Sequence, residues 1–280
     1  MRSDFGVIII SHGRPHCSTY EKLRGMGYTG KIYVVADDED KTIDEYREVY
    51  GDDLHVFHKV DDFDTADNFD GPKTVGVYAR NECIKVAREK GLKFYAEMDD
   101  DLKSLVGRYE KDGILASYKI KDIDAVFEAI CHYMEEAPVD CVGFSNAGDF
   151  IGGKENVEKK AIDHRIYNVF ILRTDYPIKW HSRHADDTIT TVEGLRNGRQ
   201  YMKLRNIQAA FDVWSGKNGS KKGGGSISTY DALGSYRLWI YGIIHYPDCI
   251  RLKMTSNHEF DYGIREVNLC PKLVSSRLQK

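Results

Sequence analysis

Leu92-Lys93-Phe94-Tyr95-Ala96-Glu97-Met98-Asp99-Asp100-Asp101 is the stretch that decides the fold, because three consecutive carboxylates directly follow an apolar, strand-like segment. The apolar segment predicts a buried strand, and the aspartates mark the point at which that strand ends. Side chains two positions apart project the same way from an extended chain, so Asp99 and Asp101 can grip one hard divalent cation through oxygen. A solvated acidic loop is the alternative interpretation of the triplet.

Strand and helix signals alternate upstream of this stretch. Runs of β-branched and apolar residues predict strands at 7–10, 31–36 and 54–58. Periodic apolar positions predict helices at 18–26, 42–50 and 75–90, the second of them opened by a capping box of Thr42 and Glu45. This alternation predicts a doubly wound, mostly parallel α/β sheet flanked by helices. Its ligands should bind beyond the carboxyl ends of the strands, where the loops after residues 10, 36 and 98 meet.

The alternation loosens after about residue 105. The sequence predicts a helix at 123–136, strands at 141–144 and 167–172, and a helix that begins near residue 184. The segment 201–211 mixes basic and apolar residues, and the low-complexity stretch 215–228 predicts a flexible loop. Because no repeat and no clean linker interrupts the chain, we expect a single domain over residues 1–280.

The overall composition gives no sign of a membrane or of a polyanionic partner. The 280 residues carry 40 basic and 44 acidic side chains, and any such partner must be found in local patches. The six cysteines are scattered without a C-x-x-C pair, which predicts free thiols in a reducing cytosol. No run of residues reaches membrane-spanning length, so a cytoplasmic location is expected.

The order of four motifs resembles that of the GT-A nucleotide-sugar glycosyltransferases. In that family an Ala-Arg-Asn helix, here within Val75–Glu82, precedes a strand with a D-x-D metal motif, here Asp99–Asp101. The opening Ile8–Pro15 resembles the first strand and turn of the family, and Asp37-Asp38 falls where the family places an acidic contact to nucleobase or ribose. The resemblance covers residues 1–105. It implies a GT-A-like fold with a nucleotide-sugar-binding half at 1–105 and a more irregular acceptor-binding half at 106–280.

The resemblance also implies roles for individual side chains. Asp101 is the expected direct ligand of Mn²⁺ or Mg²⁺, with Asp99 as a second ligand or a contact to ribose, and the cation stabilises a departing nucleoside diphosphate. Arg80 is expected to supply a cation to the diphosphate or to fix an aspartate, and an exposed helix arginine is the alternative. The full set of expected donor contacts is Ser11, Arg14, Asp37, Asp38, Arg80 and Asp99.

Two further positions complete the expected catalytic centre. An inverting transferase needs a carboxylate base near the acceptor hydroxyl, and 184–188 resembles the acidic motif in which inverting GT-A enzymes keep it. Either Asp187 or Asp186 fits this role. The family usually has Glu-Asp there, so Asp186 departs from its pattern, and helix capping is the alternative role. His258, with His245 as its competitor, is the candidate third metal ligand.

The expected acceptor comes from local charge and from a second resemblance. The basic side chains Arg199, Lys203, Lys221 and Lys222 are candidate DNA contacts, although solvated basic loops are common. The anchor-free form and the Ile10–Pro15 opening resemble phage glycosyltransferases associated with TET-type oxygenases and DNA hypermodification. That resemblance implies a UDP-type sugar donor, 5-hydroxymethylpyrimidines in double-stranded DNA as acceptor, no membrane partner, and the host cytoplasm as location.

Three other functions are compatible with parts of this pattern. A GT-A enzyme could act on a glycan or protein hydroxyl instead of DNA. A nucleotidyltransferase shares the nucleotide-binding half and the aspartates, but Gly13-Arg14-Pro15 is too short for its usual phosphate loop. A nucleic-acid-binding module on a degenerate transferase fold would bind neither metal nor UDP.

Overall fold

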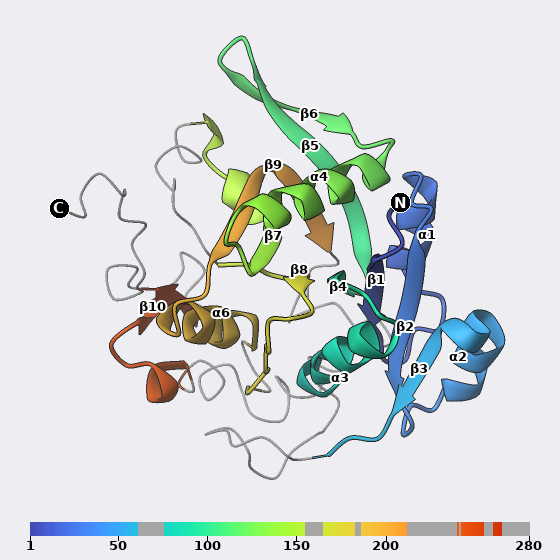
Figure 1. Ribbon diagram of the computed structural model, residues 1–280. Coiled ribbons are helices and arrows are strands. Elements are labelled where there is room, and N and C mark those ends of the chain that lie inside the picture. The colour runs from blue at the N-terminus through green and yellow to red at the C-terminus, as the bar shows by residue number, and fades with distance from the viewer. Residues whose placement is uncertain are drawn as a thin grey trace.

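A nine-stranded sheet is the centre of the fold (Figure 1). The computed structural model describes residues 1–60, 76–154, 165–182, 186–211, 240, 242–254 and 260–264. The strands of the sheet, in spatial order, are β3 (Leu54–Phe57), β2 (Lys31–Asp37), β1 (Phe5–Ile10), β4 (Phe94–Asp99), β8 (Val169–Arg173), β7 (Cys141–Asn146), β9 (Tyr201–Phe211), β5 (Leu102–Lys111) and β6 (Ile114–Lys119). A separate antiparallel pair consists of β10 (Ile250–Met254) and β11 (Phe260–Ile264).

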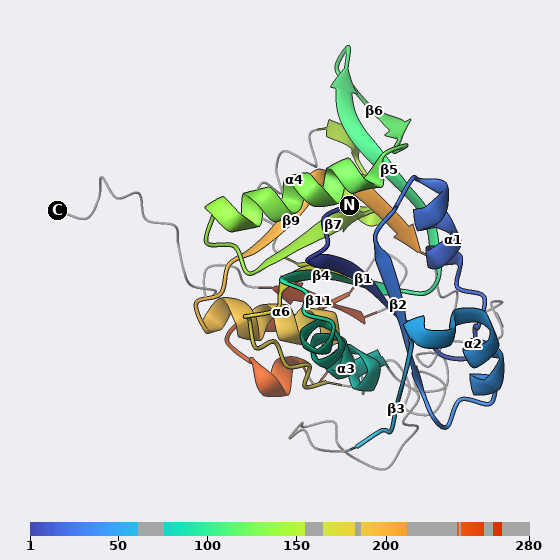
Figure 2. The same ribbon diagram turned by 45° about the vertical axis from the view of Figure 1, so that its right-hand side comes forward.

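Helices lie on both faces of this sheet. They are α1 (Ser18–Gly25), α2 (Ile43–Tyr50), α3 (Gly76–Glu89), α4 (Ile123–Glu136) and α6 (Asp186–Arg196), with short 3-10 turns η1 (Gly51–Asp53) and η2 (Ala147–Phe150). Figure 2 shows α4 on one side of the sheet and α3 and α6 on the other. The bounds of α4 are those predicted from the sequence, and α3 begins one residue later and ends one residue earlier than predicted.

Most strands of the sheet run in the same direction. β3, β2, β1 and β4 are parallel neighbours, and β7 and β9 form a further parallel pair. β8 and β5 run antiparallel to their neighbours. The predicted fold class, a doubly wound and mostly parallel α/β sheet flanked by helices, is therefore confirmed. Strands from both sides of residue 105 contribute to the same sheet.

The central strand β1 is buried on both faces, as a strand with helices on either side must be. Because its side chains alternate, Phe5, Val7 and Ile9 join the core beneath α1 and α4. Ile8 and Ile10 join the core beneath α3. The continuous apolar run that predicts this strand is thus explained by two separate packing layers.

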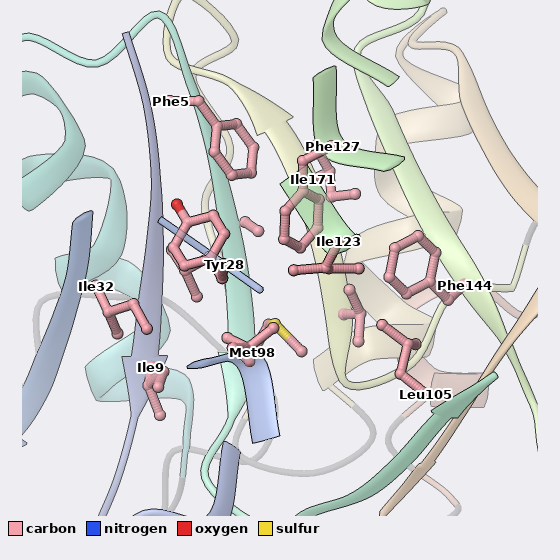
Figure 3. Close-up of a cluster of buried hydrophobic side chains, with 14 of the residues drawn as sticks. Phe5, Ile9, Tyr28, Ile32, Met98, Leu105, Ile123, Phe127, Phe144 and Ile171 are labelled. Carbon is pink, nitrogen blue, oxygen red and sulfur yellow. The ribbon is translucent and has the colours of Figure 1, made fainter. Parts of the chain in front are cut away.

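An aromatic cluster fills the first of these layers (Figure 3). The ring of Phe127 from α4 lies 4.9 Å from that of Phe5, 5.7 Å from that of Tyr28 and 6.4 Å from that of Phe144. These centroid distances lie in the range of favourable ring pairs. Phe127 therefore connects helix α4 to β1 and β7 at once.

The predicted capping box at Thr42 is wrong. Thr42 precedes α2, but its hydroxyl donates to Asp40 Oδ1 at 2.8 Å and makes no capping bond to the helix. The same oxygen of Asp40 also accepts the Thr42 backbone N–H at 2.8 Å. A carboxylate two residues upstream therefore engages the hydroxyl that the capping box requires.

The β5–β6 hairpin occupies residues 102–119, a region for which no strand or helix is predicted from the sequence. Its turn residues Asp112 and Gly113 have φ values of 53° and 78°. Two consecutive left-handed residues with the sequence Asp-Gly are typical of a two-residue hairpin turn. This dipeptide is the signal from which the hairpin could have been predicted.

Truncation of Phe127 should destabilise the fold strongly. We expect Phe127→Ala to lower the free energy of unfolding by about 3–5 kcal/mol, because it leaves a cavity between three other rings. Urea denaturation followed by far-UV circular dichroism measures this change. Tyr133→Ala, on the exposed side of the same helix, is the control and should change stability by no more than about 0.5 kcal/mol. Equal losses in the two variants would contradict the assignment of the core.

Candidate active site

The polar residues that follow β1, β2 and β4 meet at one edge of the sheet, here named the carboxyl edge. Ile10 pairs with Asp99 and with Val35, so the next residues of each strand emerge side by side. The Ser11 hydroxyl donates to Asp100 Oδ2 at 2.6 Å across this edge. The expectation that the loops after residues 10, 36 and 98 meet is therefore confirmed.

The middle aspartate of the triplet has a structural position. Asp100 is buried, and its carboxylate accepts hydrogen bonds from the Ser11 hydroxyl and from Arg14 Nη1, the latter at 2.6 Å. Burial raises the pKa of Asp100, and Arg14 opposes the rise. This burial excludes a solvent-facing position for Asp100. Asp100 instead ties the turn after β1 to the end of β4.

Asp101 keeps part of its carboxylate accessible. Its side chain is 23 % exposed, and Arg14 Nη1 lies 3.1 Å from Oδ2. Burial, followed by the charges of Asp99 and Asp100, raises the pKa of Asp101 to about 6. One arginine therefore does not compensate the negative charge gathered at this end of β4. A bound cation would lower the electrostatic cost of keeping Asp101 ionised.

Arg80 is the buried cation at the carboxyl edge, and its three guanidinium nitrogens contact three different carboxylates. Nη1 lies 2.6 Å from Glu97, Nη2 lies 2.8 Å from Asp99, and Nε lies 2.7 Å from Asp186. We call these four residues the Arg80 network. The guanidinium also lies 4.9 Å from the centre of the Trp180 ring. Burial lowers the pKa of Arg80, but the three carboxylates outweigh this effect and raise it well above the ordinary value.

The network decides between the roles expected for Arg80. An exposed helix arginine is excluded, because the side chain is buried. Arg80 fixes two predicted site residues, Asp99 on β4 and Asp186 on α6, which are far apart in the sequence. It thereby brings the first turn of α6 to the end of the strand that carries the aspartate triplet.

Two residues of this centre were missed by the sequence analysis. Glu97 lies fully buried in β4, and burial raises its pKa to about 7 although Arg80 opposes the rise. Its Oε2 has no hydrogen-bond partner among the described residues. Asn168, which has a left-handed φ of 56°, donates its side-chain amide to Asp99 Oδ2. A glutamate inside an apolar strand was an available signal for Glu97, whereas no local signal identifies Asn168.

The two candidate bases lie in the first turn of α6 and differ in their partners. Asp186 is held by Arg80 Nε, as described above. Asp187 Oδ1 accepts the Thr188 backbone N–H at 2.6 Å, and no ion pair to Asp187 occurs among the described residues. Burial raises the pKa of both groups, and the charge of Asp186 adds to the rise at Asp187. The pKa of Asp187 is therefore raised, and its carboxylate, unlike that of Asp186, is not bound by Arg80.

A second acidic group lies at the ends of β1 and β2. His12 Nδ1 lies 2.8 Å from Asp37 and 3.4 Å from Asp40, an arrangement that could hold a metal ion. The ammonium of Lys59, however, lies 2.6 Å from Asp37 Oδ1. Burial raises the pKa of Asp37, but His12 and Lys59 lower it more, and the net change is downward. Lys59 thus already supplies a cation to this group. Its neighbour Asp38 lies on the surface, 2.9 Å from His58 Nδ1.

The expected DNA contacts have different environments. Lys203 is buried, because its side chain is 1 % exposed and its ammonium pairs with Asp149 at 3.1 Å, and this placement disfavours the phosphate contact expected for it. Arg199 is partly exposed, lies over the Tyr176 ring and lines a cavity of about 190 Å³ between the 176–181 segment and α6. None of the predicted catalytic carboxylates lines that cavity. The predictions for His258, Lys221, Lys222 and the 215–228 loop lie outside the described residues.

Within the described segments, no helix is both long and apolar enough to cross a membrane.

Comparison with known proteins identifies the family. A crystal structure of glucosyl-3-phosphoglycerate synthase from Mycobacterium tuberculosis in complex with Mg²⁺ and uridine diphosphate is similar to this chain with a TM-score of 0.49. The two are 9 % identical, and the likeness covers 94 % of this chain and 87 % of that one. No curated protein matches the sequence. The model of the family described as TET-Associated Glycosyltransferase matches residues 5–222. Because that match extends over most of the sequence, the chain belongs to the TET-associated glycosyltransferases and is a nucleotide-sugar glycosyltransferase.

Proposed function

We propose that this enzyme transfers a sugar from a UDP-type donor to the hydroxyl of a 5-hydroxymethylpyrimidine in phage DNA, with the help of a divalent cation. One observation carries the proposal. Arg80 joins Asp99, at the end of a parallel strand, to Asp186, at the start of α6. A donor-binding aspartate and a candidate base helix are therefore held together where an α/β sheet binds its ligands. The family's association with TET-type oxygenases supports the DNA acceptor.

The carboxylates at the end of β4 fit a hard cation. Asp101 is partly exposed, and the single positive charge of Arg14 does not balance the negative charges of Asp101 and its neighbours Asp99 and Asp100. Asp99, two positions away, presents oxygen at the same edge, and Mg²⁺ or Mn²⁺ prefers such ligands. Asp101 would be the main ligand and Asp99 a second ligand or a contact to ribose. When bound, the cation supplies Lewis-acid stabilisation of the departing diphosphate.

The remaining donor contacts follow from the turn after β1. Arg14 is held by Asp100 and Asp101, so its guanidinium lies beside the carboxylates that would hold the cation. It can contribute positive charge toward the diphosphate, which supports the role expected for it. Asp37, Lys59 and His12 form the polar group at the neighbouring strand end, where they can contact the nucleoside.

Asp187 is the proposed general base. A base must be ionised to accept the proton of the acceptor hydroxyl, and a raised pKa makes the ionised form more basic. Asp186 is less suited, because its carboxylate is engaged by Arg80. In this assignment Asp186 positions α6, and Asp187 removes the proton. Arg199, Lys221 and Lys222 stay proposed as contacts to the DNA acceptor.

Donor binding should depend on Asp101. Saturating UDP with Mn²⁺, at about 100 times the Kd, should stabilise the wild-type protein by about 2.7 kcal/mol and raise its Tm. Asp101→Asn should lose most of this rise, because one metal ligand is removed. Differential scanning fluorimetry measures both. Asp44→Asn, an exposed carboxylate on α2, is the matched control and should respond like the wild type. A full rise in Asp101→Asn would refute the metal assignment.

Transfer should depend on Asp187, with a recognisable effect of pH. We expect Asp187→Asn to lower kcat by about 10²- to 10⁴-fold while leaving the Tm rise with UDP and Mn²⁺ intact. In the wild type, kcat should fall as pH drops through the raised pKa of Asp187, above the ordinary value of about 3.9, because the protonated acid cannot act as a base. UDP release during transfer to hydroxymethylated DNA measures kcat.

Asp186→Asn is the comparison variant for this experiment. It removes one partner of Arg80 and should act mainly through the position of α6. If Asp186→Asn abolishes transfer and Asp187→Asn does not, the base is Asp186, and the assignment made above is wrong.

A further inference from the structure

The β5–β6 hairpin projects beyond the rest of the sheet (Figure 1). β9 pairs with β5 only from Leu102 to Gly107, whereas β6 follows β5 to the turn, where Lys111 pairs with Ile114. The outer part, residues 108–117, is therefore a two-stranded ribbon. β5 also begins directly after Asp101, so one end of the hairpin lies at the proposed reaction centre. Its ten residues extend over roughly 33 Å, at about 3.3 Å per residue.

One face of the hairpin carries exposed aromatic and aliphatic side chains. Tyr109, Tyr118 and Ile114 are 44 %, 53 % and 71 % exposed. The two tyrosine rings lie 6.0 Å apart, and the ring of Tyr118 covers Gly107, where any Cβ would collide with it. Strand alternation places Tyr109 and Lys111 on the same face as Gly107. Large exposed side chains gathered on a projecting element are typical of a binding surface.

The charge of the hairpin is opposite to that of the whole chain. Residues 102–119 contain four basic and two acidic side chains, whereas the chain has a net charge of −4. Glu110, one of the two acids, is paired with Lys154 at 2.8 Å. Lys111 and Lys119 are exposed and form no ion pair with a described residue. Lys111 lies on the face of Tyr109 and Tyr118, whereas Lys119 pairs with Val106 and projects from the opposite face. The hairpin thus offers positive charge on both faces and tyrosine hydroxyls on one of them.

We propose that this hairpin binds the DNA duplex that flanks the target base, an inference that rests on the proposed function. Lysine side chains and tyrosine hydroxyls are groups that contact phosphates, and a two-stranded ribbon fits the major groove. A span of roughly 33 Å corresponds to about ten base pairs at 3.4 Å each. The hairpin therefore anchors DNA up to about ten base pairs away from the base that is modified.

A second copy of the chain is the less favoured occupant of this face. β6 is an edge strand of the sheet, and its unpaired backbone groups could pair with another strand. Lys119 lies on β6, and Lys111 lies directly opposite Ile114, the first residue of β6. Lysines at the edge of a sheet disfavour association between strands of two molecules. The same lysines favour a polyanion.

The test compares Lys111→Gln/Lys119→Gln with a control of equal charge change, Lys31→Gln/Lys85→Gln, in exposed positions of β2 and α3. Fluorescence anisotropy with hydroxymethylcytosine duplexes gives Kd as a function of salt. We expect the hairpin variant to bind DNA more weakly than the wild type. The slope of log Kd against log salt should be smaller by about two, because each lost phosphate contact reduces it by about one. The control should retain the wild-type slope. Tyr109→Ala should also weaken binding.

Duplex length provides the second readout. With flanks of about 12 base pairs on each side, the wild type should bind more tightly than with flanks of about 4, whereas the hairpin variant should bind both alike. Wild-type Kd and slope in the hairpin variant would overturn the proposal. The proposal would also be overturned if the wild type forms a dimer that the hairpin variant does not form, because this face would then bind a second copy of the chain.

The binding experiment does not require sugar transfer. If the wild type binds UDP but transfers no sugar to DNA, the DNA acceptor of the proposed function is wrong, and anisotropy still decides whether the hairpin binds duplex DNA. If transfer occurs and the hairpin variant binds DNA normally, the proposed function stands and the hairpin proposal fails.

Discussion

The arrangement of the proposed catalytic centre depends on one buried cation, the guanidinium of Arg80. Its three nitrogens contact carboxylates from β4 and α6, and the ring of Trp180 lies against it. Buried charges are costly without partners, and breaking such a group typically costs 3–5 kcal/mol. Each member is therefore stable only while the others are in place. Because Asp99 and Asp186 share this cation, the helix with the proposed base cannot move away from the proposed metal site without leaving charges unpaired.

The three aspartates at the end of β4 also differ in their charged and hydrogen-bonding partners. Asp100, engaged by Ser11 and Arg14, fixes the turn after β1 against the end of β4. The side chains of Asp99 and Asp101 are both 23 % exposed, and they differ in their cationic partner, which is Arg80 for Asp99 and Arg14 for Asp101. A dense acidic run is thus tolerated because two arginines neutralise most of it. The incompletely compensated carboxylate, Asp101, is the one best placed to bind a cation.

Local pattern predicted much of this fold, and long-range contacts account for what it missed. The β-branched run at 7–10 predicted strand β1, and the apolar period at 123–136 predicted helix α4. The order of the motifs around Arg80 predicted that the ends of β1 and β4 lie at the same edge. Asn168 reaches Asp99 from a distant loop, and Lys203 is buried against Asp149, neither of which any local period can indicate. The apolar neighbours of Glu97 in the sequence could have indicated that it is buried, but they could not have identified Arg80 as its partner. The Asp112-Gly113 turn, by contrast, was a local signal.

We propose that the Arg80 network assembles the catalytic centre of a glycosyltransferase for hydroxymethylated DNA. Mass spectrometry of nucleosides tests it most directly, after DNA with hydroxymethylcytosine or hydroxymethyluracil has been incubated with the protein, Mn²⁺ and a panel of nucleotide sugars. The account predicts a glycosylated nucleoside with the wild type and about 10- to 100-fold less with Arg80→Lys, whose single ammonium cannot orient three carboxylates. No glycosylated nucleoside from either DNA with any donor, or wild-type yield from Arg80→Lys, would contradict it.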